Sequence, residues 1–206
     1  MPVDNIYKAP DCIWGFWKVL EDERSLATVV PFEKVSDAIV NPFKRLEFLA
    51  GRVLIKSLLK NWNVDYNGLT KDEFGKPFLT DSDIQISLSH SYPYVAAIIH
   101  RHKKVGIDLE QPKDKLLRIA PRILAERELK DAGNDIVKHC VYWCAKEALI
   151  KIYGKKDLIL AKNLLITPFL LSSEGYLIGR ILANNSETAI PLHYIVYENF
   201  VVVVSN

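Results

Sequence analysis

The sequence predicts an α+β fold made of two similar-sized halves. Two long segments repeat apolar residues with helical spacing, and several short segments have strand-like apolar patterns. Strands and helices come in blocks rather than in strict alternation, which favours α+β over α/β. A chain of 206 residues is long enough for one large domain or two small ones. The charged turn at 101–104 is the best boundary, and it gives halves of residues 1–103 and 104–206.

The N-terminal half is expected to begin with a strand over residues 12–19, which are rich in aromatic side chains. A helix follows, for which Ser36 is a candidate N-cap, although Pro42 places the firm start of the helix near residue 42. The helix runs to about residue 60, and residues 61–77 form a loop. The apolar stripe of this helix consists of Leu46, Leu49, Ala50, Val53, Leu54 and Leu58.

The middle of the chain contains three short strand-like segments, residues 84–88, 94–99 and 105–110. Because turn residues and a charged tetrapeptide separate them, we expect an antiparallel meander.

The C-terminal part is expected to contain two helices and several strands. Residues 119–132 predict one helix that ends at Gly133. Asp135 is suited to cap a strong helix over residues 136–153, which Gly154 ends. Residues 163–204 then read as strands separated by turns.

Composition excludes several classes of function. Lys and Arg number 27 against 25 Asp and Glu, a net charge of +2, which is too balanced for nucleic-acid binding. Neither an apolar leader nor an 18-residue apolar run is present, so we expect no membrane segment. Sparse cysteines without a leader indicate reduced thiols and a cytoplasmic protein. These cysteines are Cys12, Cys140 and Cys144.

Two carboxylates lie two residues apart in the third predicted strand. Asp108 and Glu110 therefore point to one face. Their like charges repel unless a cation or proton lies between them. Oxygen ligands of this kind favour magnesium, which also binds substrate phosphates. The alternative is a charged pair on an exposed strand edge, a common arrangement for this spacing.

A third carboxylate lies on the last long helix. Glu147 and Lys151 share a face because they are four residues apart, and an ordinary surface ion pair is the simplest interpretation. However, this helix is apolar nearly all round, which is typical of a buried helix. The pair is therefore less suited to a solvated face.

Basic and hydroxyl side chains upstream are candidates for binding phosphate. Arg45, Arg52 and Lys56 lie on one side of the first long helix, which is either a phosphate-binding stripe or a solvated face. Lys76 lies in a stiff turn, and Ser89 and His90 end a strand, where the imidazole can donate to a phosphate oxygen. A serine-hydrolase interpretation lacks an orienting third group and a nucleophile elbow.

Together, Gly106–Glu110 and Trp143–Lys151 resemble the paired signature motifs of the 4′-phosphopantetheinyl transferase superfamily. The other family motifs are resembled by three upstream segments, which follow the family's order along the chain: Ala50–Arg52, Gly75–Pro77 and Ser89–Ser91. The length resembles the two-half, Sfp-type form rather than the short trimeric form. The resemblance implies two pseudo-symmetric α+β halves in one chain, an active site in the cleft between them, and a monomer.

The resemblance implies transfer of 4′-phosphopantetheine from coenzyme A to a serine hydroxyl of an acyl or peptidyl carrier protein, with release of 3′,5′-ADP. Asp108, Glu110 and Glu147 would hold Mg²⁺, with Mn²⁺ as an alternative. Glu147 is also the candidate general base, and Lys151 would neutralise charge on the leaving phosphate. The residues implied to contact coenzyme A are Arg45, Arg52, Lys76, Ser89, His90, Asp108 and Lys151.

Two other functions remain open at this point. The same carboxylates suit a magnesium-dependent nucleotide or pyrophosphate hydrolase, or a nucleotidyltransferase, that needs no carrier protein. A non-catalytic carrier-binding module is the second alternative, but such a module would be expected to lose Asp108, Glu147 or Lys151, and all three are present. The carrier stays unidentified, and residues 112–129 are the predicted part of its docking surface.

Overall fold

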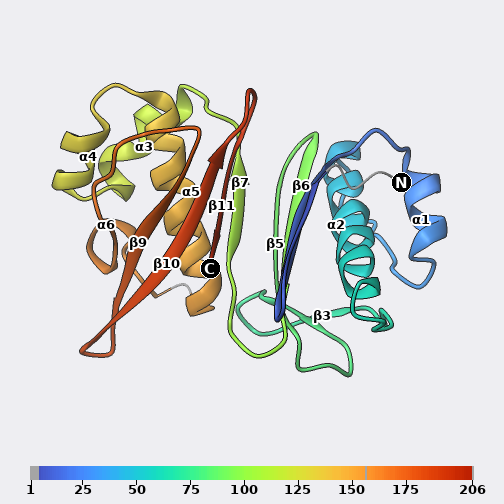
Figure 1. The fold of residues 1–206 in the computed structure, drawn as a ribbon. Helices are drawn as coiled ribbons and strands as arrows, with labels where there is room; N and C mark the ends of the chain where they lie inside the picture. Colours follow the sequence, from blue (N-terminus) through green and yellow to red (C-terminus); the bar gives the residue numbers. More distant parts are fainter. Residues whose placement is uncertain (1–4, 156, 206) are drawn as a thin grey trace. The chain divides into compact units, whose positions relative to one another are not determined.

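A computed structural model describes residues 5–155 and 157–205 of the chain (Figure 1). The chain divides into two compact units, Met1–Val105 and Gly106–Asn206, and each contains helices and a sheet around its own apolar core. The prediction of a mixed α and β fold is therefore confirmed. No helix within the described ranges is both long and apolar enough to cross a membrane.

The first unit is a four-stranded antiparallel sheet covered by a long helix (Figure 1). In spatial order, its strands are β1 (Asn5–Ala9), β2 (Cys12–Lys18), β6 (Tyr94–His100) and β5 (Gln85–Ser91). The helices are α1 (Glu23–Val29) and α2 (Pro42–Lys60), and a separate hairpin joins β3 (Leu69–Lys71) to β4 (Pro77–Leu79). The apolar stripe of α2 packs into the core of this unit, as its periodicity predicts.

The start of α2 differs in part from the sequence expectation. Asn41 is the N-cap, and its side chain accepts hydrogen bonds from the backbone amides of Phe43 and Lys44. Pro42 takes the first helical position, as predicted. The prediction of Ser36 as the N-cap was wrong, because the Ser36 hydroxyl accepts a hydrogen bond from the amide of Ala38 in a separate turn.

The second unit is a five-stranded antiparallel sheet packed against α5 (Figure 1). Its strands, in spatial order, are β7 (Ile107–Glu110), β11 (Val201–Ser205), β10 (Ser186–Val196), β9 (Glu174–Ala183) and β8 (Leu164–Ile166). Its helices are α3 (Lys115–Ile123), α4 (Glu126–Ala132), α5 (Ile136–Tyr153) and α6 (Leu160–Asn163).

Two expectations for the middle of the chain were wrong. β5 and β6 form the predicted hairpin, but β7 leaves it and pairs with β11, over 90 residues later. Alternation predicts a strand and its faces, but it does not select a partner. The single helix expected over 119–132 is two helices, α3 and α4, which are separated by an extended break at Leu124 and Ala125.

The helix α5 begins and ends as its sequence predicts. The Asp135 side chain accepts from the amides of Val137 and Lys138, and Gly154 takes the left-handed conformation (φ 85°) at the C-terminal end. One strand approaches this helix very closely, since a Cβ added at Gly106 would lie 2.1 Å from the carbonyl oxygen of Ala148. Glycine at this position therefore sets the distance between β7 and α5.

Candidate active site

The strand β7 and the helix α5 bring an acidic cluster together inside the second unit. Asp108 is only 5% exposed, and Lys151 Nζ lies 2.8 Å from its Oδ1. The same ammonium donates to the carbonyl oxygen of Ile107 at 2.7 Å. Lys151 therefore connects α5 to β7, and it does more than form a surface pair along its own helix.

Glu147 lies in the same electrostatic environment, one turn before Lys151. Burial raises the pKa of this carboxyl to about 7, and the negative charge of Asp108 adds to the effect. Lys151 acts in the opposite direction, and Glu110 contributes a further increase. Asp108 and Glu110 are thus both close enough to Glu147 for their charges to act on its carboxyl.

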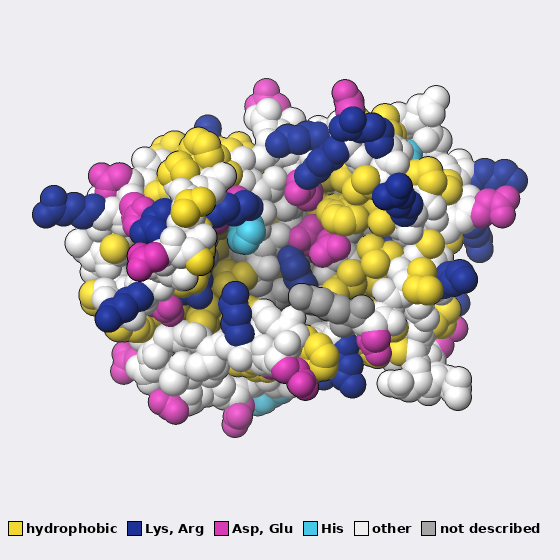
Figure 2. Space-filling view, turned by 180° about the vertical axis from the view of Figure 1, so that it is seen from behind, with side chains coloured by type: hydrophobic (Ala, Val, Ile, Leu, Met, Phe, Trp, Pro, Cys, Tyr) yellow, Lys and Arg dark blue, Asp and Glu magenta, His cyan; other side chains and the backbone are white. Residues whose placement is uncertain are grey.

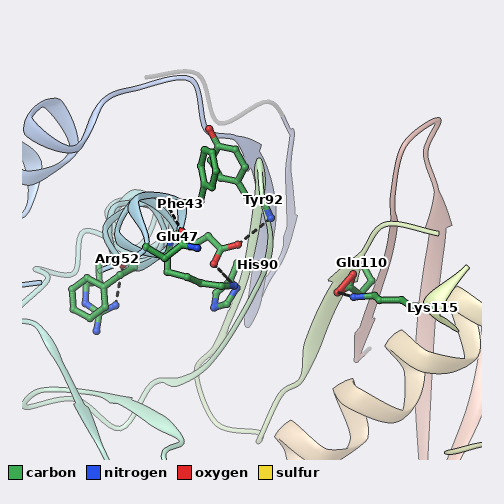
Figure 3. Close-up of polar contacts among 10 residues, drawn as sticks. Phe43, Glu47, Arg52, His90, Tyr92, Glu110 and Lys115 are labelled. Atoms are coloured by element: carbon green, nitrogen blue, oxygen red, sulfur yellow. Dashed lines mark hydrogen bonds and ion pairs between the residues drawn. The ribbon is translucent and has the colours of Figure 1, made fainter. Parts of the chain in front are cut away.

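Glu110 lies at the more open side of this cluster. Its Oε1 is 3.4 Å from Lys115 Nζ, at the start of α3, and Figure 3 shows this pair. An exposed pair at this distance contributes little to stability. Lys115 is therefore a weakly held counter-charge for Glu110.

The carboxylates fit a hard divalent cation. They supply oxygen ligands, and their mutual repulsion would be relieved by positive charge between them. Among the described residues, no group of three or more His, Cys, Asp or Glu side chains is arranged so that it could hold a metal ion by itself. Magnesium is suited to such an incomplete set, because it keeps several waters and shares its remaining positions with substrate phosphates.

A separate cavity of about 580 Å³ lies within the first unit. Its wall includes Arg52, Ser89 and His90, three of the residues proposed from the sequence, together with the basic residues Lys44 and Lys71. The structure thus brings the end of β5 and one side of α2 to a single hollow. Neither Arg45 nor Lys76 is among the residues that line it in the described part of the chain.

The two arginines of α2 are held by carboxylates. Arg45 makes a two-bond pair with Glu23, at 2.8 Å from Nε and 2.6 Å from Nη2. Arg52 donates from Nε to Glu33 at 2.8 Å, and its guanidinium lies 3.3 Å from the centre of the Phe48 ring. Such fixed guanidinium planes can bind phosphate only through their remaining N–H groups.

Lys76 lies in the loop of the β3–β4 hairpin. Gly75 takes a positive φ of 86° there, and Asp72 Oδ1 accepts from the backbone amide of Lys76 at 2.8 Å. Burial lowers the pKa of the Lys76 ammonium, and the charge of Lys104 adds to this decrease. The turn predicted from the sequence is present, and it places Gly75 and Pro77 at the cavity wall.

Several buried carboxylates were missed from the sequence. Glu47 is 3% exposed at the cavity wall, and Glu33 holds Arg52 and accepts from the Tyr66 hydroxyl. Glu128 forms a fully buried pair with Lys146 at 2.6 Å. The sequence pattern that could have identified them is an acidic or basic residue within the apolar stripe of a helix. Glu47, one turn before Ala50 and Gly51, is an example.

Figure 2 shows basic, acidic and apolar side chains interspersed on the visible face, in keeping with the balanced composition. A basic surface that would suit nucleic acid is not evident on this face.

Comparison with known proteins identifies a matching family model and three relatives. Residues 104–203 match the family model of the 4′-phosphopantetheinyl transferase superfamily. The 4′-phosphopantetheinyl transferase Sfp of Bacillus subtilis strain 168 is 31% identical over 118 residues, which cover 52% of this chain and 51% of that protein. A 4′-phosphopantetheinyl transferase and the 4′-phosphopantetheinyl transferase ffp, both of Bacillus subtilis, are 30% identical with the same coverage. The chain thus spans about half the length of the curated relatives it matches.

Proposed function

Since residues 104–203 match the family model of the 4′-phosphopantetheinyl transferase superfamily, we propose that the chain transfers 4′-phosphopantetheine from coenzyme A to a serine of a carrier protein. The serine Oγ forms a bond to the pantetheine-side phosphorus, the bond to the bridging pyrophosphate oxygen breaks, and 3′,5′-ADP leaves. An acyl or peptidyl carrier protein is the acceptor.

The acidic cluster of the second unit is the observation that carries this proposal. The cluster contains three carboxylates, those of Asp108, Glu110 and Glu147. Lys151 pairs with Asp108 and supplies positive charge within this cluster. This arrangement is unfavourable for the fold alone, because a carboxyl with a raised pKa resists ionisation at neutral pH. A bound cation would compensate for that cost.

The three carboxylates would hold Mg²⁺, or Mn²⁺, together with the pyrophosphate of coenzyme A. A bound magnesium ion supplies Lewis-acid stabilisation of charge that develops on the phosphate oxygens. Lys151 Nζ is held by Asp108 and the Ile107 carbonyl. It would act together with the metal ion by neutralising charge on the leaving phosphate.

Glu147 is the proposed acceptor of the proton from the carrier serine hydroxyl. Its pKa of about 7 in the metal-free protein is near the pH at which a general base is most effective. A bound cation would lower that pKa and weaken the base, so the ligand role is the more strongly supported of the two.

The nucleotide end of coenzyme A would occupy the cavity of the first unit. Arg52, Ser89 and His90 lie on its wall, and a volume of about 580 Å³ is in the usual range for a small-molecule site. Arg45 and Lys76 would act from nearby positions. We further propose that the two units are pseudo-symmetric and that residues of both contribute to the activity, so that a single chain is sufficient.

Intact-mass spectrometry of an apo acyl carrier protein tests the function. The carrier is incubated with this protein, coenzyme A and Mg²⁺, and a peptidyl carrier protein is tested in parallel. We expect a gain in mass of one phosphopantetheine group, which EDTA prevents. A carrier variant with alanine in place of the acceptor serine is the matched control.

Other outcomes separate the remaining functions. Release of phosphate or of 3′,5′-ADP without a carrier would favour the hydrolase. Carrier binding without any mass gain, with coenzyme A and Mg²⁺ present, would favour a non-catalytic module and contradict the proposal.

A further inference from the structure

Glu47 is a buried carboxylate in the wall of the cavity in the first unit. It projects from α2 and is only 3% exposed. Three donors from different segments surround it: Lys44 Nζ lies 2.6 Å from Oε2, His90 Nδ1 lies 3.2 Å from Oε2, and the Tyr92 backbone amide donates to Oε1 at 3.0 Å. Figure 3 shows Glu47 pointing from the helix toward His90 and Tyr92.

Such a carboxylate is costly for the fold. An ionised group out of water needs compensating charges and hydrogen bonds, and an apolar residue would fill the same helical position without that requirement. The neighbours of Glu47 on α2 show that the position lies beside the core, since Gly51 and Leu54 are fully or nearly fully buried. A role at the cavity would explain its presence.

The geometry fixes one nitrogen of His90. Because a carboxylate can only accept, the proton of the imidazole lies on Nδ1 whenever this contact is made. The ring is then held in one orientation, in the same way that carboxylates orient histidines in catalytic and metal sites. His90 remains 49% exposed at the cavity wall, so the oriented ring is accessible from the hollow.

We propose that Glu47 is a positioning residue that orients His90, with Lys44 beside it, for binding of the phosphate-bearing part of coenzyme A. The inference rests on the proposed function. Glu47 need not touch the substrate, because its carboxylate acts through His90 Nδ1. The positive charge of Lys44 offsets the single negative charge of Glu47. When His90 is protonated, its Nε2–H can donate to a phosphate oxygen while its Nδ1–H is held by Glu47.

The test compares Glu47→Gln with His90→Ala and with the double variant. Glutamine keeps the size of the side chain and can still accept from the Tyr92 amide, so the chain is expected to fold. Transfer kinetics with varied coenzyme A should show KM raised about tenfold in Glu47→Gln, the loss expected for one charge-assisted hydrogen bond, with kcat nearly unchanged. Glu187→Gln is the matched control, because it removes a half-exposed carboxylate that pairs with Arg180 on the surface.

The double variant decides whether Glu47 acts through His90. If it does, adding Glu47→Gln to His90→Ala should change KM by less than about twofold. An undiminished effect in that background, or a loss confined to kcat and thermal stability, would overturn the proposal.

Nitrogen-15 spectra of the histidine rings give a readout that does not need activity. Glu47→Gln should shift the ring signals of His90, which are identified by their loss in His90→Ala. Unchanged His90 signals would also overturn the positioning role. If the wild-type chain neither binds coenzyme A by calorimetry nor transfers, the proposed function fails, whereas the ring signals still decide whether Glu47 orients His90.

Discussion

Asp108, Glu110 and Glu147 show how a candidate site can oppose the stability of its own unit. Their charges act on one another, and burial raises the pKa of Glu147 to about 7. The ion pair of Lys151 with Asp108 offsets part of this repulsion. Active sites commonly retain such unfavourable groups because the bound substrate and cation compensate for them.

Replacing Glu147 with glutamine should therefore stabilise the ligand-free protein while it abolishes transfer. Between the unfolded pKa, near 4.5, and the folded pKa, near 7, the folded chain holds the extra proton, so wild-type stability falls as the pH rises. Above pH 7 the variant should be more stable by on the order of 2 kcal/mol, and below about pH 4.5 the two should be equal. Urea unfolding in EDTA at pH 4 and pH 8 measures this difference.

Asp108→Asn is the companion variant in the same cluster. It removes the charge that Lys151 pairs with, so it should abolish transfer and should not give the stabilisation at pH 8. Robust transfer by either variant would contradict the assignment of the acidic cluster as the active site.

The packing of β7 on α5 sets the spacing of this cluster. The strand can approach the helix only because Gly106 has no side chain, since an added Cβ would meet the backbone of Ala148 at 2.1 Å. Backbone atoms cannot move aside as a flexible side chain can. The separation between Asp108 on the strand and Glu147 on the helix therefore depends on Gly106, a residue that has no side chain to take part in the reaction.

Gly106→Ala is expected to lower the free energy of unfolding by about 3 kcal/mol and to impair transfer. Gly51→Ala is the control within α2, where a Cβ would make an ordinary contact of 3.4 Å with Leu88 and helix propensity favours alanine. Guanidinium unfolding of both variants gives the comparison. Equal stability of Gly106→Ala and wild type would show that β7 and α5 are less tightly coupled than the structure indicates.

Long periodic helices were predictable, but short elements and strand partners were not. The start of α2 at Pro42 and the caps of α5 follow from local sequence signals. The helices α1 and α6 have at most two turns and too few residues to show periodicity. β7 joins β11 because a long-range apolar pairing was available there, which no local pattern encodes.

Each unit of the chain has a separate apolar core. The Lys146–Glu128 pair illustrates how the second unit is held together: Glu128 also accepts from the backbone amides of Ala125 and Ile166, and so connects α4, α5 and β8. With every partner present, such a buried network favours one arrangement of its elements. The first unit uses Glu33 and Glu47 in the same manner.

We expect the chain to be a monomer, because both proposed parts of the active site lie in one polypeptide. Sedimentation equilibrium should give the mass of a single chain, 23.5 kDa, with and without coenzyme A and Mg²⁺. A trimer, as in the short form of the family, would contradict the proposal that two units of one chain complete the site.

The sequence by itself determined the mixed fold, the two long helices and the signature residues Asp108, Glu110, Glu147 and Lys151, because these depend on spacing along the chain. Only the tertiary structure decided which charges are neutralised. From the sequence, Arg45 and Arg52 form either a phosphate-binding stripe or a solvated helix face, and the fold pairs them with Glu23 and Glu33. Glu47 carried no motif, yet it contacts His90 across 43 positions of sequence. Ion pairs form between groups that folding brings within a few ångströms, and local spacing does not contain that information.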